Sequence, residues 1–159
     1  MKKIDIEAAE TRTGSRYPAP FHEVGMDKIR RRLGHAADLT QFGVNLLTLR
    51  PGVWSSQRHW HTHDEEFVFV VSGEITLVTD AGEEVLRAGD CAGFKAGDPD
   101  GHHLVNRSDR DAVVLEIGTD HAEDVCTYPD IDMIALPTGY AHKDGTPYPP
   151  RKLSASAPG

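Results

Sequence analysis

The sequence predicts a single all-β domain, a sandwich or barrel of short strands, and three observations support this prediction. Between residues 42 and 118, short apolar runs alternate with turns rich in Gly, Asp and Pro, a pattern typical of antiparallel strands. One of these runs carries three histidines that stand two residues apart. A chain of 159 residues is long enough to bury one core, so we expect one domain.

Turn signals divide the central segment into candidate strands. Pro51-Gly52 ends the first run and Ser72-Gly73 ends the third, because Pro and Gly interrupt a strand and favour a turn. In chain order, the candidate strands are Phe42–Arg50, Trp54–Thr62, Phe67–Val71, Glu74–Thr79, Glu84–Arg87, Cys91–Phe94, His102–Asn106 and Ala112–Gly118. We therefore place the barrel at residues 42–118.

Residues 1–41 predict an N-terminal arm and a short helix packed on the barrel. Thr11–Pro20 contains one glycine and two prolines, which favours an extended arm able to pair with a sheet edge of its own subunit or of a neighbour. Met26–Leu39 predicts the helix. We interpret its basic residues as a solvated helix face rather than a phosphate-binding patch, because the whole chain is acidic. These residues are Lys28, Arg30, Arg31 and Arg32.

Residues 119–159 predict a C-terminal extension. Tyr128–Leu136 alternates in polarity and is expected to add one edge strand. Pro137–Gly159 contains five of the ten prolines, which predicts a tail that is ordered only where it packs on a neighbour. We interpret the aromatic side chains of this tail as surface residues, with a lid over a pocket as the alternative. These are Tyr140, His142 and Tyr148.

Charge and composition limit the partners. The chain has 17 basic and 25 acidic residues, and a net charge of −8 repels nucleic acids and anionic membranes. The N-terminal segment has no apolar run and no stretch is long and apolar enough to span a bilayer, so we expect a cytoplasmic protein. Two cysteines are too few for a disulfide framework, and we interpret Cys91 and Cys126 as small apolar fillers.

The candidate functional residues begin with His59, His61 and His63. On an extended strand, side chains two residues apart project from the same face. Buried imidazoles need a partner for their lone pairs, and a divalent metal ion satisfies several at once. Together with the nearby carboxylate of Glu66, the set suits Fe, Mn, Ni, Cu or Zn better than Ca or Mg.

Two motifs in this region resemble those of the cupin superfamily. The first comprises Gly52, His59, His61, Glu66 and Gly73, and the second comprises Gly89, Gly97, His102 and Asn106. Three positions depart from the family pattern: Gly52 is one residue further from His59, Lys95 replaces the usual proline, and four residues instead of two separate Gly97 from His102. The resemblance covers roughly Phe42 to Gly118.

The resemblance implies a jelly-roll fold with one metal ion held by His59, His61, Glu66 and His102, the ion being Fe, Mn, Ni or Zn. It also implies a homodimer and an enzyme acting on a small polar metabolite. Small cupins with similar R-H-W-H and G-H-H-L-V-N runs are labelled sugar-phosphate isomerases. A cupin dioxygenase or lyase, and a non-catalytic binding protein, remain as alternatives.

Several neighbouring residues compete with the named ligands. His63 is an alternative to His59, Glu65 to Glu66, and His103 to His102. The family spacing favours the named residues, because six residues lie between Glu66 and Gly73, and three residues lie between His102 and Asn106 whereas only two lie between His103 and Asn106. For substrate contacts, Gln57 shares the ligand face of the predicted strand, and Lys95 is a candidate for an anion. No catalytic residue is assigned.

Overall fold

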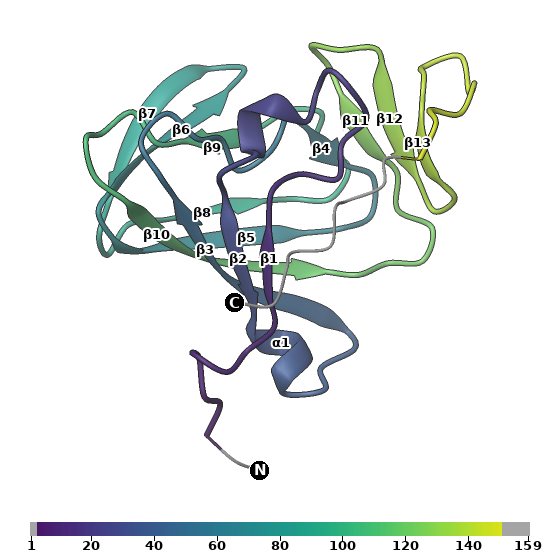
Figure 1. The fold of residues 1–159 in the computed structure, drawn as a ribbon. Helices are drawn as coiled ribbons and strands as arrows, with labels where there is room; N and C mark the ends of the chain where they lie inside the picture. Colours follow the sequence, from purple (N-terminus) through teal and green to yellow (C-terminus); the bar gives the residue numbers. More distant parts are fainter. Residues whose placement is uncertain (1–2, 151–159) are drawn as a thin grey trace.

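Antiparallel β-sheets are the dominant regular structure of residues 3–150, the part of the chain that the computed structural model describes (Figure 1). A six-stranded sheet has the order β1-β2-β3-β10-β5-β8, a three-stranded sheet the order β7-β6-β9, and a four-stranded sheet the order β13-β12-β11-β4. The strands of the barrel are β3 (Phe42–Leu49), β4 (Trp60–His61), β5 (Glu66–Ser72), β6 (Glu74–Thr79), β7 (Gly82–Arg87), β8 (Cys91–Phe94), β9 (His103–Val105) and β10 (Ala112–Thr119). The predicted all-β class is confirmed.

The main core lies between the six-stranded and the three-stranded sheets. Leu47, Leu49, Val70 and Val114 enter it from one sheet and Ile75 from the other, and all five side chains are fully buried. Each such side chain contributes about 1.5–3 kcal/mol through the apolar surface that it removes from water. This core fixes the strands β5 and β9, which flank the candidate site.

One predicted strand of the barrel is largely irregular. Within Trp54–Thr62, only Trp60–His61 forms a strand, and Trp54 and His59 make isolated bridges to Val105 and His102. The backbone amides of this segment bond to different elements: that of Trp54 donates to Val24 and that of Ser55 to Leu104. The segment therefore forms no continuous ladder, although it still sets His59 opposite His102.

The predicted helix at Met26–Leu39 is wrong. Glu23–Gly25 forms a 3₁₀ turn (η1), Ile29–Arg32 forms strand β2, and only Leu33–Ala36 is helical (α1). β2 pairs with the edge of β3, and β1 (Thr11–Thr13) pairs with β2, so the arm covers a sheet edge of its own chain as predicted. Pairing with this edge outweighs the weak local helix preference. The basic residues therefore follow strand alternation instead of forming a solvated helix face.

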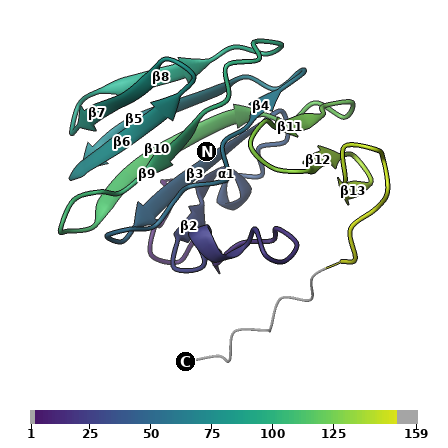
Figure 2. The same cartoon turned by 90° about the horizontal axis from the view of Figure 1, so that it is seen from above.

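The C-terminal extension is more ordered than predicted. Instead of one edge strand, it contains β11 (Cys126–Tyr128), β12 (Met133–Leu136) and β13 (Gly139–Ala141), which form a sheet with β4 at one end of the sandwich (Figure 2). Up to residue 150 the predicted tail packs on its own chain; residues 151–159 lie outside the described part. Tyr140 is not a surface residue, because its ring packs edge-on against Tyr17 with centroids 5.5 Å apart.

The outer face of the six-stranded sheet is apolar. Pairing aligns Phe67 with Ile117 and Phe69 with Leu115 across β5 and β10, and Leu115 with Leu46 across β10 and β3. Phe67 and Phe69 remain 41% and 37% exposed. Exposed aromatic side chains that lie together suit this face to contact with another protein surface.

No helix among residues 3–150 is long and apolar enough to cross a membrane.

Candidate metal centre

Three imidazoles surround one carboxylate oxygen, that of Glu66. The Oε2 atom of Glu66 lies 2.9 Å from Nε2 of His102, 3.3 Å from Nε2 of His59 and 3.7 Å from Nε2 of His61. The backbones of His59 and His102 bond to each other in both directions, and Glu66 begins β5. The four residues named from the sequence are thus brought together; their role as ligands stays a prediction.

The geometry of this cluster fits a transition-metal ion. Two ligand atoms that each lie about 2.1 Å from one ion, at right angles, are separated by about 3 Å. The distances from Glu66 to His102 and His59 are close to this value, and these three residues each offer a ligand atom within 4.8 Å of the others; His61, at 3.7 Å from Glu66, lies further away. Three nitrogens and one oxygen are a donor set that Fe, Mn, Ni and Zn accept, whereas Ca and Mg prefer oxygen alone.

Further contacts orient two of the imidazoles. Nδ1 of His61 lies 2.6 Å from Oδ2 of Asp124, and Nδ1 of His59 lies 2.9 Å from the carbonyl oxygen of Gln57. Because these oxygens only accept, they hold the proton on Nδ1 and leave the Nε2 lone pair free to bind a metal ion. Asp124 also accepts the backbone N–H groups of His63 and Asp64, at 2.8 and 3.1 Å.

His102 is held differently. Its ring stacks on Phe94 with centroids 3.5 Å apart and planes 2° from parallel, and its buried Nδ1 has no hydrogen-bond partner among the described residues. Burial lowers the pKa of His102, and this effect outweighs the hydrogen bond to Glu66. The imidazole is therefore kept in the neutral form that a metal ligand requires.

The carboxylate of Glu66 is kept ionised. Burial by itself raises the pKa of Glu66, but hydrogen bonds from His102 and His59 bring it well below its usual value. Burial likewise lowers the pKa of His59, and its contacts with Glu66 more than offset that effect. A negative charge surrounded by imidazoles is an electrostatic environment that favours a divalent cation.

The competing residues point elsewhere. His63 is exposed and stacks on His121, with centroids 4.8 Å apart, and Glu65 is exposed. His103 is buried on the opposite face of β9, where it stacks on Trp54 at 4.4 Å. None of His63, Glu65 and His103 therefore joins the cluster around Glu66.

The candidate centre opens on a cavity of about 1130 Å³ that reaches the N-terminal arm. Val68 and Leu104 line it, so part of the wall beside the candidate ligands is apolar. Gln57 does not line it, because its Nε2 atom donates to the carbonyl of Phe21 at 2.8 Å. Lys95 lines a smaller pocket of about 150 Å³ that also contacts His61, Glu66 and His102.

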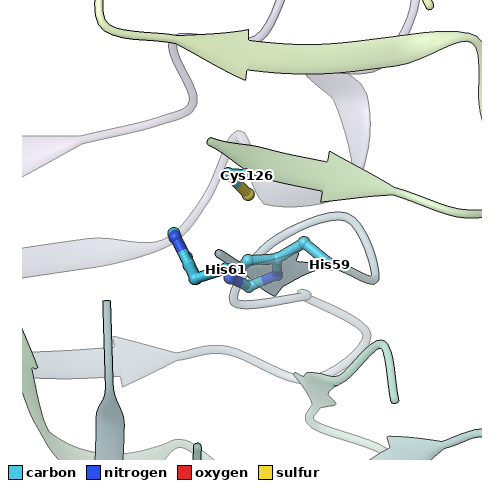
Figure 3. Close-up of side chains that lie close together, drawn as sticks. All are labelled: His59, His61 and Cys126. Atoms are coloured by element: carbon cyan, nitrogen blue, oxygen red, sulfur yellow. The ribbon is translucent and has the colours of Figure 1, made fainter. Parts of the chain in front are cut away.

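Cys126 also faces the candidate centre. Figure 3 shows it beside His59 and His61, and one ligand atom from each of the three residues lies within 4.8 Å of the others. The sequence interpretation as an apolar filler agrees with its burial but missed this position. Burial raises the pKa of the Cys126 thiol, so it stays protonated and is a poor ligand in this state.

The β-sandwich, the two sequence motifs and the cluster of three imidazoles around Glu66 are together the features of a cupin. A cupin domain profile matches residues 45–118, and the chain is 43% identical to a solved member of the cupin superfamily over nearly its full length. The chain belongs to the cupin superfamily.

That solved structure is described as a sugar phosphate isomerase from Silicibacter pomeroyi DSS-3; the TM-score is 0.87, with 97% of this chain and 98% of that chain covered. A proposed sugar phosphate isomerase from Acidithiobacillus ferrooxidans ATCC 23270 is 28% identical, with a TM-score of 0.68 and coverage of 72% and 74%. The polyketide cyclase RemF from Streptomyces resistomycificus, at 18% identity and a TM-score of 0.60 over 75% and 79%, shares the fold alone. No protein with a curated description matches the sequence significantly.

Proposed function

We propose that this protein is a metal-dependent isomerase of small sugar phosphates. The observation that carries the proposal is the convergence of three imidazoles and one carboxylate at the wall of a cavity large enough for a small metabolite. The 43% identity to a structure described as a sugar phosphate isomerase supports the substrate class.

Isomerisation of a sugar moves a proton between adjacent carbons, and negative charge develops on the carbonyl oxygen as it proceeds. A divalent ion held by the four side chains would act as a Lewis acid at that oxygen. Four protein ligands leave positions open for substrate oxygens. Asp124 fixes the orientation of His61, and Val68, Leu104 and Phe94 limit the access of water.

The proposal is tested with protein stripped of metal and reconstituted separately with Fe, Mn, Ni or Zn. Each form is incubated with aldose and ketose phosphates, product formation is followed by NMR, and O₂ uptake is recorded in parallel. We expect interconversion without O₂ uptake, and loss of turnover in Glu66→Gln. O₂ uptake stoichiometric with substrate would replace the isomerase with a dioxygenase. Thermal stabilisation by a compound that is never converted would replace it with a binding protein.

The homodimer and the cytoplasmic location stay predictions. The apolar outer face of the six-stranded sheet, rather than the N-terminal arm, is the surface that now supports the dimer, because the arm is occupied by pairing with its own chain. A second copy is the simplest occupant of a face that presents a row of phenylalanines from one strand.

A further inference from the structure

Lys28 places a buried positive charge in the wall of the cavity. The residue is only 7% exposed, and its ammonium donates to the carbonyl oxygen of Ser55 at 2.5 Å. That carbonyl is its one hydrogen-bond acceptor among residues 3–150, and no carboxylate of this part of the chain pairs with it. An ammonium has three N–H groups, so donors remain for a further acceptor in the cavity.

Arg30 stands two residues further along, on β2, and lines the same cavity as Lys28, which directly precedes that strand. Its guanidinium makes two hydrogen bonds to Glu116, at 2.8 and 3.0 Å, and both side chains line the cavity. Lys28, Arg30 and Glu116 together carry two positive charges and one negative charge. Lys28 itself forms no ion pair with a side chain of residues 3–150, and the ring of Tyr17 lies 5.8 Å from its ammonium.

The charge of Lys28 is costly to keep without an anion. Burial, and then the neighbouring Arg30, lower its pKa to about 8. The residue is therefore still mainly protonated at neutral pH, with most of its hydration removed and no counter-charge in contact. A lysine that served only to stabilise the fold would be expected to pair with a carboxylate.

The charged wall and the candidate metal centre belong to one cavity. Ser55, whose carbonyl binds Lys28, has its hydroxyl 3.3 Å from that of Ser56, and the hydroxyl of Ser56 lies 3.2 Å from Nδ1 of His59. A short polar chain of contacts thus links the ammonium to a candidate metal ligand. A small substrate with a carbonyl group at one end and an anion at the other would find complementary groups at both.

We propose that Lys28, assisted by Arg30, binds the phosphate group of the substrate. This inference rests on the proposed function, and it identifies the residues that select phosphorylated sugars over neutral ones. It also gives a role to the two basic residues that line the cavity, Lys28 before β2 and Arg30 within it, whereas Arg31 does not line the cavity and pairs with Glu7.

The first test measures anion binding without turnover. Full-length protein is stripped of metal, so that an anion has no ion to bind, and its affinity for inorganic phosphate is measured by calorimetry. Loss of a hydrogen bond to a charged group weakens binding roughly tenfold or more, which we expect for Lys28→Gln and for Arg30→Gln. Arg87→Gln, which removes an equal charge from the exposed strand β7, should change the affinity less than about twofold.

Two variants keep the test informative. Arg30 is a third exposed, so Arg30→Gln is expected to fold even if Lys28→Gln does not. Lys28→Arg retains the charge and should recover much of the phosphate affinity. Wild-type affinity in both Lys28→Gln and Arg30→Gln would overturn the inference.

The second test separates this inference from the proposed function. In metal-loaded protein, Lys28→Gln should raise KM for a sugar phosphate at least about tenfold, whereas Arg87→Gln should leave that KM within about twofold of the wild type. If no sugar phosphate is isomerised while phosphate binding still depends on Lys28, the anion site stands and the proposed function is wrong. If sugar phosphates are isomerised and Lys28→Gln has no effect on KM, the proposed function stands and the inference is wrong.

Discussion

Replacing Asp124 by Asn tests how the chain prepares a histidine to bind metal. Asp124 is 11% exposed, and its Oδ2 atom accepts a hydrogen bond from Nδ1 of His61 at 2.6 Å. An Asn amide turned the same way donates to Nδ1 instead, which favours the tautomer that carries its proton on Nε2. In that tautomer, His61 cannot bind a metal ion through Nε2.

The magnitude follows from these contacts. Loss of a carboxylate that supports a metal-binding histidine typically lowers metal affinity 10- to 100-fold, which corresponds to about 1.4–2.8 kcal/mol. The fold should lose less, because the Asn oxygen can still accept the backbone N–H groups of His63 and Asp64. Asp124→Ala leaves both groups without a partner and should also lower the free energy of unfolding, by about 1–3 kcal/mol for each.

Competition with a chelating dye measures the metal affinity, and chemical denaturation measures stability. Asp132→Asn is a matched control, because Asp132 makes the same pair of contacts at the other end of the chain: Oδ2 to Nδ1 of His142 at 2.7 Å and Oδ1 to the backbone N–H of Lys143 at 2.9 Å. We expect wild-type metal affinity in this control. Equal affinity in Asp124→Asn and the wild type would refute the reasoning.

Three further predictions concern charge, backbone and assembly. Burial lowers the pKa of Lys28 to about 8, against about 10.4 in an unfolded chain, so the unfolded state binds more protons than the folded state between these pH values. The free energy of unfolding should therefore rise with pH from about 8 to 10. Chemical denaturation at pH 7.5 and 9.5 should show this rise in the wild type and not in Lys28→Met. Gly73 and Gly52 share φ values near +80°, but a Cβ at Gly73 would lie 2.7 Å from the carbonyl oxygen of Asp111, whereas a Cβ at Gly52 would have no atom within 4 Å. Gly73→Ala should therefore lower the free energy of unfolding clearly more than Gly52→Ala. Equal losses in the two variants would count against the packing argument. The predicted homodimer should dissociate into monomers in Phe69→Glu, on the exposed apolar face, as measured by light scattering. A monomeric wild type at micromolar concentration would contradict the predicted assembly.

Turn signals in the sequence predicted most strands of the barrel, and the resemblance of its two motifs to those of cupins named the four side chains that the structure brings together. Within Trp54–Thr62 the strand prediction holds only for Trp60–His61, and His59 is placed instead by its isolated bridge to His102. Turn signals and motif spacings are short-range patterns. The same kind of reasoning failed for Met26–Leu39, because the pairing of β2 with β3 is a long-range contact that no local pattern records.

The contacts that orient the candidate ligands could not be predicted from the sequence either. Asp124 stands 63 residues from His61, and an acidic residue in an apparent loop gives no sign of a buried partner. Cys126 was interpreted as a filler for the same reason. Lys28 was grouped with exposed arginines, and only the structure shows that it is buried in the cavity wall, where it donates to the carbonyl of Ser55, 27 residues away.

The most direct test of the candidate metal centre compares two adjacent histidines. His102 and His103 are both buried, at 6% and 5% exposure, but only His102 reaches Glu66, whereas His103 stacks on Trp54. Metal content per chain is measured by elemental analysis in the wild type, His102→Gln and His103→Gln, each purified without chelator or nickel resin and shown by thermal unfolding to be folded. One transition-metal ion per chain in the wild type and His103→Gln, with almost none in His102→Gln, is the predicted result. A wild type without metal, or retention of the ion in His102→Gln and its loss in His103→Gln, would contradict the account.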